Sequence, residues 1–229
     1  MDSAPPASET DPARPDELPP EELRAELLRL VRDRGLTRRA EPFALSSGGS
    51  SHDYVDLRRA VSRGDDLRLA AQAVVAALGR EGARFDAIGG MTMGADPVAH
   101  AVAMLTSTAW FSVRKAEKAH GSRRRIEGAQ LTSASRVVLF EDTVTTGRSL
   151  VEALDVVQES GAQVLLACTL LDRGDVAAPL VATRATRYLA LLRYDDIGID
   201  PVTPTGPPPG AAPPGASGDP TDGTRAPTG

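Results

Sequence analysis

The region from residue 21 to 194 alternates short apolar runs with segments whose apolar residues recur at helical spacing. The apolar runs have the length of buried strands and span residues 85–90, 109–115, 136–142, 163–173 and 187–194. Helical spacing is found at residues 21–35, 65–82, 96–105 and 148–161. Apolar strands that alternate with helices predict a parallel, twisted sheet flanked by helices, which is the α/β class. Ligands bind such sheets at the carboxyl ends of the strands.

The two ends of the chain differ in composition from this alternating region. Fifteen of the eighteen prolines lie in residues 1–20 and 201–229, which contain few apolar residues. Both ends are therefore predicted to be disordered tails on either side of one domain, residues 21–200. The tails carry net charges of −4 and −1, which account for the whole formal charge of −5. The neutral domain argues against a general nucleic-acid or membrane-surface binder.

The chain contains a single cysteine, Cys168, within the apolar run QVLLACTLL. It cannot form an internal disulfide, which fits a reducing cytoplasm. The sequence has no basic-then-apolar leader at its start and no apolar run near eighteen residues. We therefore expect a soluble, cytoplasmic protein.

Residues 137–150 read VVLFEDTVTTGRSL, in which an apolar strand runs into two carboxylates, a hydroxyl-rich loop and a helix. Backbone N–H groups at a helix start bind anions, and Gly147 permits close approach of a phosphate. Glu141 and Asp142 would repel that phosphate unless they bind sugar hydroxyls or a metal, so a ribose phosphate fits both parts. Further donors are the hydroxyls of Thr143, Thr145, Thr146 and Ser149. The alternative is a pair of solvated acids before an ordinary helix cap.

The segment VVLFEDTVTTGRS resembles the phosphoribosyl diphosphate (PRPP) binding motif of the type I phosphoribosyltransferases. The resemblance implies their fold, a parallel twisted sheet flanked by helices, with a small hood and a mobile lid loop. It also implies that the loop holds the ribose 5-phosphate and that the acidic pair holds the 2- and 3-hydroxyls, with Asp142 catalytic. The PRPP-binding residues implied here are Glu141, Asp142, Thr143, Val144, Thr145, Thr146, Gly147, Arg148 and Ser149.

Three further stretches resemble the orotate phosphoribosyltransferases of that superfamily. VRKAEKAHGSRRRIEG (113–128) is similar to their lid pattern R-K-x-x-K-x-H-G. FALSSGGSSHDYVDLR (43–58) and GGMTMGADPVAHAVA (89–103) are similar to two other segments, the second of which is the loop on the diphosphate side. Together with the PRPP motif, these stretches extend the resemblance over residues 21–197.

The lid resemblance implies that basic side chains contact the diphosphate, namely Arg114, Lys115, Lys118 and His120. Lys118 and His120 would be catalytic residues on a lid lent by the neighbouring subunit of a homodimer. Six lysines and arginines lie between residues 114 and 125 against one acid, a concentration suited to a diphosphate. The alternative is a solvated basic hairpin, and we expect Arg123, Arg124 and Arg125 to be solvated lid charges.

The resemblance also implies that Thr145 and Arg173 hold orotate, with the guanidinium acting as a planar fork for the orotate carboxylate. The alternative for Arg173 is an ion pair with Asp172 or Asp175 at the end of the strand. Some members of the family carry lysines where Ser46 and Met93 stand in this chain. Those lysines would assist phosphate and diphosphate binding.

The implied reaction transfers the 5-phosphoribosyl group from PRPP to orotate, giving orotidine 5-monophosphate and diphosphate in the biosynthesis of pyrimidine nucleotides. The implied cofactor is Mg²⁺ held mostly by substrate oxygens, so no residue is assigned as a metal ligand. One alternative is a phosphoribosyltransferase for another base, which would not predict the lid pattern. Another is a PRPP-sensing regulator, which would be expected to carry a nucleic-acid-binding region and a degraded lid.

Overall fold

The structure is a computed structural model that describes residues 18–44, 50–116 and 125–202. The predicted tails lie almost wholly outside the described residues, as do Ser46 and the lid residues Lys118 and His120. Residues 45–49 and 117–124, which lie between the described parts, belong to the stretches 43–58 and 113–128 that resemble the family.

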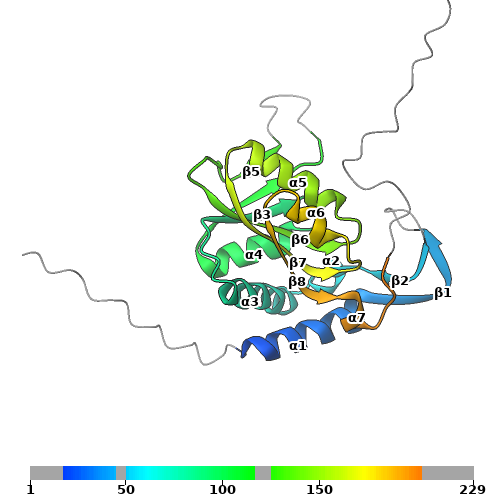
Figure 1. The fold of residues 1–229 in the computed structure, drawn as a ribbon. Helices are drawn as coiled ribbons and strands as arrows, with labels where there is room; N and C mark the ends of the chain where they lie inside the picture. Colours follow the sequence, from blue (N-terminus) through cyan, green and yellow to red (C-terminus); the bar gives the residue numbers. More distant parts are fainter. Residues whose placement is uncertain (1–17, 45–49, 117–124, 203–229) are drawn as a thin grey trace, which may run out of the picture.

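The described elements follow one another in the order that the sequence pattern predicts, with a hairpin near the start (Figure 1). They are α1 (Pro20–Leu30), the π-helical turn η1 (Val31–Gly35), β1 (Leu36–Ala44), β2 (Ser50–Val55), α2 (Leu57–Ala60), α3 (Gly64–Arg80), β3 (Ala87–Met91), α4 (Asp96–Thr106), β4 (Ala109–Val113), β5 (Ile126–Gly128), β6 (Arg136–Val144), α5 (Arg148–Glu159), β7 (Gln163–Asp172), α6 (Ala177–Ala182), β8 (Arg187–Arg193) and α7 (Tyr194–Ile197).

Within the described residues the main sheet has the strand order β5-β4-β3-β6-β7-β8. Strands β4, β3, β6, β7 and β8 run parallel to one another, as the alternation of strands and helices predicts. β5 is the exception, because it pairs antiparallel with β4 and carries the chain back from the lid segment. The sequence analysis did not identify this strand, which is three residues long and directly follows the arginine run.

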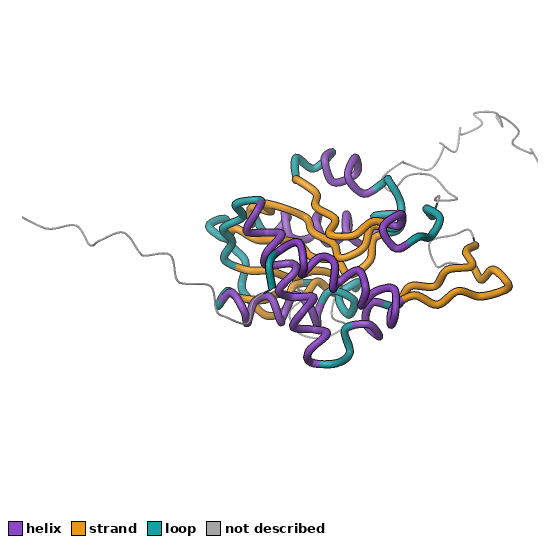
Figure 2. Tube along the Cα trace, turned by 90° about the horizontal axis from the view of Figure 1, so that it is seen from below, coloured by secondary structure: helices purple, strands orange, loops and turns teal. Residues whose placement is uncertain are grey.

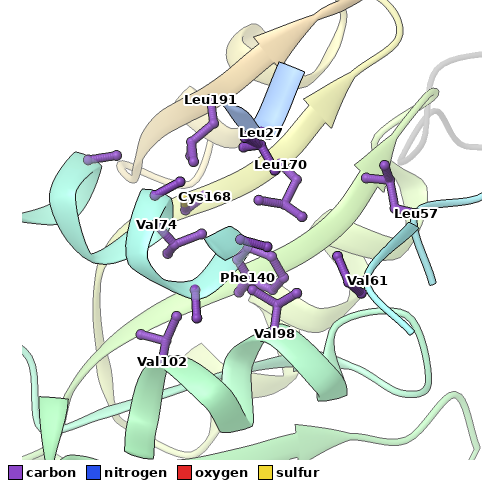
Figure 3. Close-up of a cluster of buried hydrophobic side chains, with 14 of the residues drawn as sticks. Leu27, Leu57, Val61, Val74, Val98, Val102, Phe140, Cys168, Leu170 and Leu191 are labelled. Atoms are coloured by element: carbon purple, nitrogen blue, oxygen red, sulfur yellow. The ribbon is translucent and has the colours of Figure 1, made fainter. Parts of the chain in front are cut away.

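Helices cover both faces of the sheet, and the side chains of β6 show how the faces divide (Figure 1). Val138 and Phe140 point into a cluster with α1, α3 and α4, whereas Val137 and Leu139 point into a second cluster with α5 and α6. This alternation is the period of two expected for a strand. Figure 3 shows the first cluster, which contains Val98, Phe140 and Cys168. The predicted doubly covered α/β architecture is confirmed.

Strands β1 and β2 form an antiparallel hairpin that projects from the body of the molecule, visible in orange at the right of Figure 2. The sequence analysis matched part of this segment to a family stretch without predicting its strands. This hairpin is called the hood below. Arg38 holds the hairpin together, because its Nε donates to Oδ1 of the buried Asp53 at 2.7 Å across the strand pair.

Strand β6 extends beyond its predicted end at residue 142. Thr143 and Val144 continue the pairing with β7, opposite Leu171 and Asp172. Glu141 and Asp142 therefore lie within the strand, two or more residues before its end, and the sheet fixes the positions of their backbones. Among the described residues, no helix is long and apolar enough to cross a membrane.

Candidate active site

Two adjoining cavities lie at the carboxyl ends of β3, β4 and β6. The first has a volume of about 350 Å³ and is lined by Lys115, Glu141 and the residues from Thr143 to Leu150. The second has a volume of about 340 Å³ and is lined by residues 54–58, 91–94 and 141–143, with Lys115 and Ser149. Four lining residues belong to both, namely Lys115, Glu141, Thr143 and Ser149. The cavities are therefore neighbouring parts of one site.

The first cavity is an anion cradle formed where β6 gives way to α5. Gly147 has a φ of +75°, which favours glycine, and the helix begins at the next residue, Arg148. The first N–H groups of α5, a helix of twelve residues, therefore open toward the cavity. The structure brings together here all the loop residues that the sequence predicted to bind a phosphate, from Thr143 to Ser149.

The carboxylate residues Glu141 and Asp142 both line the second cavity, and Glu141 also lines the first. Glu141 is 8% exposed, and its Oε2 atom is buried without a hydrogen-bond partner among the described residues. Burial raises the pKa of Glu141 well above its usual value, and the neighbouring charge of Asp142 adds to the rise. Burial also raises the pKa of Asp142, although the N–H of Thr143 donates to its Oδ1 at 2.8 Å. The burial of both carboxylates argues against the alternative interpretation, in which they are solvated acids.

The basic residues predicted for the diphosphate differ in where they lie. Lys115 is exposed and lines both cavities. Arg114 lines neither cavity, and its Nη1 lies 3.6 Å from Oε1 of Glu127 on β5.

The prediction that Arg125 is a solvated lid charge is wrong. Its Nε donates to the backbone oxygen of Arg114 at 3.0 Å, its Nη2 donates to that of Lys115 at 3.1 Å, and it also pairs with Glu152. A guanidinium provides several donors in a fixed fork, so it can bind two adjacent backbone oxygens and a carboxylate at once. Arg125 therefore fastens the base of the lid segment, while Arg123 and Arg124 lie outside the described residues.

Arg173 follows β7 and is 4% exposed. Its Nη2 donates to the backbone oxygen of Asp53 in the hairpin at 2.9 Å, and its Nε is buried without a partner among the described residues. The ion pair considered as an alternative is not found among the described residues. Asp172 instead accepts from Gly174 N and from the hydroxyl of Tyr188, and Asp175 pairs with Arg193.

The turn after β3 approaches the acidic pair closely. A Cβ atom added to Gly94 would lie 2.7 Å from Oδ1 of Asp142. Asp96 holds this turn to β4, because it accepts from the hydroxyls of Thr92 and Ser112 at 2.7 Å each. The sequence analysis matched the stretch 89–103 to the diphosphate side but assigned no role to Asp96.

No group of three or more His, Cys, Asp or Glu side chains suited to hold a metal ion is found in residues 18–44, 50–116 and 125–202. Mg²⁺ is usually bound by one or two carboxylates together with water and substrate phosphates, not by a cage of protein ligands. Two adjacent carboxylates, one with an unpaired buried oxygen, fit that mode of binding.

Two named relatives show to which protein family the chain belongs. No family model matches the sequence. The chain is 38% identical over 187 residues to an orotate phosphoribosyltransferase of Streptomyces coelicolor, a match that covers 78% of this chain and 99% of the relative. An orotate phosphoribosyltransferase of Mycobacterium tuberculosis is 40% identical over 182 residues, covering 77% and 97%. The chain belongs to the orotate phosphoribosyltransferase family.

Solved orotate phosphoribosyltransferases share the fold. A crystal structure of the Mycobacterium tuberculosis H37Rv orotate phosphoribosyltransferase in complex with PRPP matches with a TM-score of 0.64 and 35% identity, covering 77% of this chain and 99% of that one. The Aeropyrum pernix orotate phosphoribosyltransferase matches with a TM-score of 0.67 and 30% identity, covering 75% and 95%. The family and the type I fold predicted from the motifs are therefore confirmed, and the chain is an enzyme of the transferase class.

Proposed function

We propose that the protein transfers the 5-phosphoribosyl group of PRPP to orotate, producing orotidine 5-monophosphate and diphosphate for pyrimidine nucleotide synthesis. The observation that carries the proposal is the joining of a helix-start anion cradle to a buried carboxylate pair, in a chain of this family.

The substrate PRPP spans both cavities in this proposal. The N–H and hydroxyl groups of residues 145–149 bind its 5-phosphate in the first cavity. Glu141 and Asp142 accept hydrogen bonds from the ribose hydroxyls where the two cavities adjoin, Glu141 lining both and Asp142 the second. The diphosphate then extends into the second cavity, toward Lys115 and the turn after β3. In this proposal the side chain of Arg114 moves away from Glu127 and contacts the diphosphate there.

The chemical step breaks the bond between the anomeric carbon of ribose and a diphosphate oxygen, and the bonding electrons leave with the diphosphate. A ring nitrogen of orotate, losing its proton, forms the new bond to that carbon. Positive charge develops on the ribose and negative charge on the leaving group, so the protein acts through positioning and electrostatic stabilisation. No nucleophilic residue is assigned, and no covalent intermediate with the protein is expected.

Mg²⁺ would be held by substrate oxygens together with Glu141 or Asp142, and when bound it supplies neutralising charge to the leaving group. The protein's own basic groups act on the same charge. Lys115 contributes from the end of β4, and Lys118 and His120 would contribute from the lid. We expect the lid to be lent by the second subunit of a homodimer and to exclude water from the cationic ribose.

Arg173 and Thr145 would hold orotate. The backbone oxygen of Asp53 fixes one end of the guanidinium, and the unpaired buried Nε is a donor in need of an acceptor. A planar carboxylate such as that of orotate matches this fork. Asp172 supports the arrangement by fixing the turn that follows Arg173. The single cysteine, Cys168, is buried in the core, in keeping with the expected cytoplasmic location.

A panel of acceptor bases tests the proposal. Purified protein is mixed with Mg²⁺ and PRPP, and diphosphate release is measured with orotate, uracil, adenine or hypoxanthine as the acceptor. We expect release with orotate alone, and loss of at least about 100-fold in rate for Asp142→Asn. Release with a purine in place of orotate would identify a phosphoribosyltransferase for another base. PRPP binding without release for any acceptor would instead indicate a PRPP sensor.

A further inference from the structure

The second cavity contains an arginine to which neither the motifs nor the reaction assigned a role. Arg58 lies on α2 directly after the hood, and its side chain lines the cavity together with Met93 and Lys115. The side chain is 53% exposed, and its Nε lies 3.8 Å from Oδ1 of Asp56, a long contact for an ion pair. The guanidinium therefore has donors free to turn toward a ligand in the cavity.

The ionisable side chains that line this cavity include more acids than bases. Its lining side chains include three acids, Asp56, Glu141 and Asp142, against two bases, Arg58 and Lys115. Met93, which is 67% exposed, also lines the cavity and adds no charge. The carboxylates would repel a diphosphate bound here. Contacts with both Arg58 and Lys115 would offset that repulsion.

Arg58 already acts on the acids of the site. Burial raises the pKa of Asp142, and the positive charge of Arg58 is among the groups that oppose the rise. An effect of this kind requires the guanidinium to lie near the carboxylate, which is consistent with the lining of the cavity. Arg58 also follows Asp56, whose side chain caps α2 by accepting from Arg59 N at 3.1 Å and so fixes the start of the helix.

We propose that Arg58 is a substrate-binding residue that contacts the diphosphate of PRPP in the second cavity. The proposal rests on the proposed function for the orientation of PRPP. With the 5-phosphate in the cradle and the ribose over the carboxylates, the diphosphate lies in the cavity that Arg58 lines. An arginine reaching across from α2 supplies two parallel donors to the diphosphate oxygens.

The test compares three variants by calorimetric binding of PRPP and of inorganic diphosphate, each with Mg²⁺, to the full chain. Arg58→Gln removes the charge and keeps a long side chain suited to a helix. Arg59→Gln is the matched control, because Arg59 is the next residue and is exposed but does not line the cavity. The double variant Arg58→Gln with Met93→Lys returns a positive charge to the same cavity from the turn after β3.

We expect Arg58→Gln to weaken the binding of PRPP and of diphosphate about tenfold, as for the loss of a charge-assisted hydrogen bond. Arg59→Gln should bind as the unaltered protein does, and the double variant should recover most of the loss. Equal binding by Arg58→Gln and the unaltered protein would overturn the proposal. Equal weakening in the two single variants would also overturn it, because it would indicate a general effect of charge.

Turnover separates this proposal from the proposed function. If the unaltered protein binds PRPP but does not consume orotate, the proposed function fails, and the binding comparison still tests Arg58. If Arg58→Gln raises the KM for PRPP while the KM for orotate is unchanged, both proposals are supported. An Arg58→Gln variant that alters only the KM for orotate would contradict a diphosphate role.

Discussion

At the scale of single residues, the candidate site contains a buried carboxylate that is only partly hydrogen-bonded. Glu141 is nearly completely buried and one of its oxygens has no partner among the described residues. Burial raises the pKa of such a group, and a ligand that supplies donors or a cation lowers it again, since ionisation without them is costly. Binding of PRPP with Mg²⁺ would therefore be coupled to loss of a proton from Glu141.

This coupling predicts a pH dependence with a defined sign. Because the pKa of Glu141 is raised, the affinity for PRPP should increase as the pH rises through that value and level off above it. Calorimetry in two buffers with different ionisation enthalpies should show proton release on binding at a pH below the raised pKa. Glu141→Gln is the control, because it removes the titrating group and keeps the shape, and it should release fewer protons. Equal proton release by the two proteins would contradict the assignment.

At the scale of elements, the close approach of β3 to its neighbours fixes the mouth of the site. A Cβ atom at Gly90 would lie 1.7 Å from the backbone oxygen of Phe140 on β6, a separation that no rearrangement of side chains can relieve. The turn at residues 92–94 starts one residue after β3, so the position of that strand sets the position of the turn.

Substitutions at two glycines test this packing. We expect Gly90→Ala to destabilise the protein by about 2 kcal/mol or more, because the added methyl group forces two strands apart. Gly79→Ala is the matched control, since Gly79 lies in α3 with nothing within 4 Å of an added Cβ. It should stabilise the protein by about 0.5–1 kcal/mol through helix propensity. Chemical denaturation measures both changes, and similar values for the two variants would be inconsistent with the proposed packing.

The sequence predicted the regular elements better than the irregular ones. The strands and helices with clear apolar periodicity, such as β7 and α5, lie within two residues of their predicted bounds. The hairpin β1–β2 was missed because Arg38, Asp53 and their neighbours are polar, and pairing across the hairpin stabilises it in place of an apolar face.

The residues of the candidate site also differ in how well the sequence predicts them. Residues 141–149 are adjacent in sequence, so their motif could be predicted from the sequence alone. The fastening role of Arg125 and the position of Arg58 depend on contacts between segments far apart in the chain. Arg58 meets Met93 and Lys115 only after α2, β3 and β4 have been brought to one edge of the sheet. Short-range patterns do not contain that information.

At the scale of the whole molecule, Arg173, the proposed orotate ligand, is tied to the last described residues. Val202 is buried, and its N–H donates to the backbone oxygen of Arg173 at 2.7 Å. The turn at Gly174 packs against the same residue, since an added Cβ would lie 3.0 Å from the oxygen of Val202. The functional domain should therefore extend two residues beyond the predicted boundary at 200.

Two trimmed chains test this extent. A chain of residues 18–202 should keep the melting temperature and the kinetic constants of the full chain. A chain of residues 18–200 should raise the KM for orotate about threefold to tenfold, because one backbone hydrogen bond to Arg173 is lost. Steady-state kinetics with orotate as the varied substrate measure the difference. Identical KM values for the two trimmed chains would show that Val202 does not support Arg173.

The most direct test of the account is a pair of saturation curves for the unaltered protein and for Arg173→Ala, followed by the loss of orotate ultraviolet absorbance. The account predicts that the unaltered protein consumes orotate in the presence of Mg²⁺ and PRPP. It also predicts that Arg173→Ala raises the KM for orotate at least about tenfold while the KM for PRPP changes less than about twofold. No consumption of orotate by the unaltered protein, or an equal change in both KM values, would contradict it.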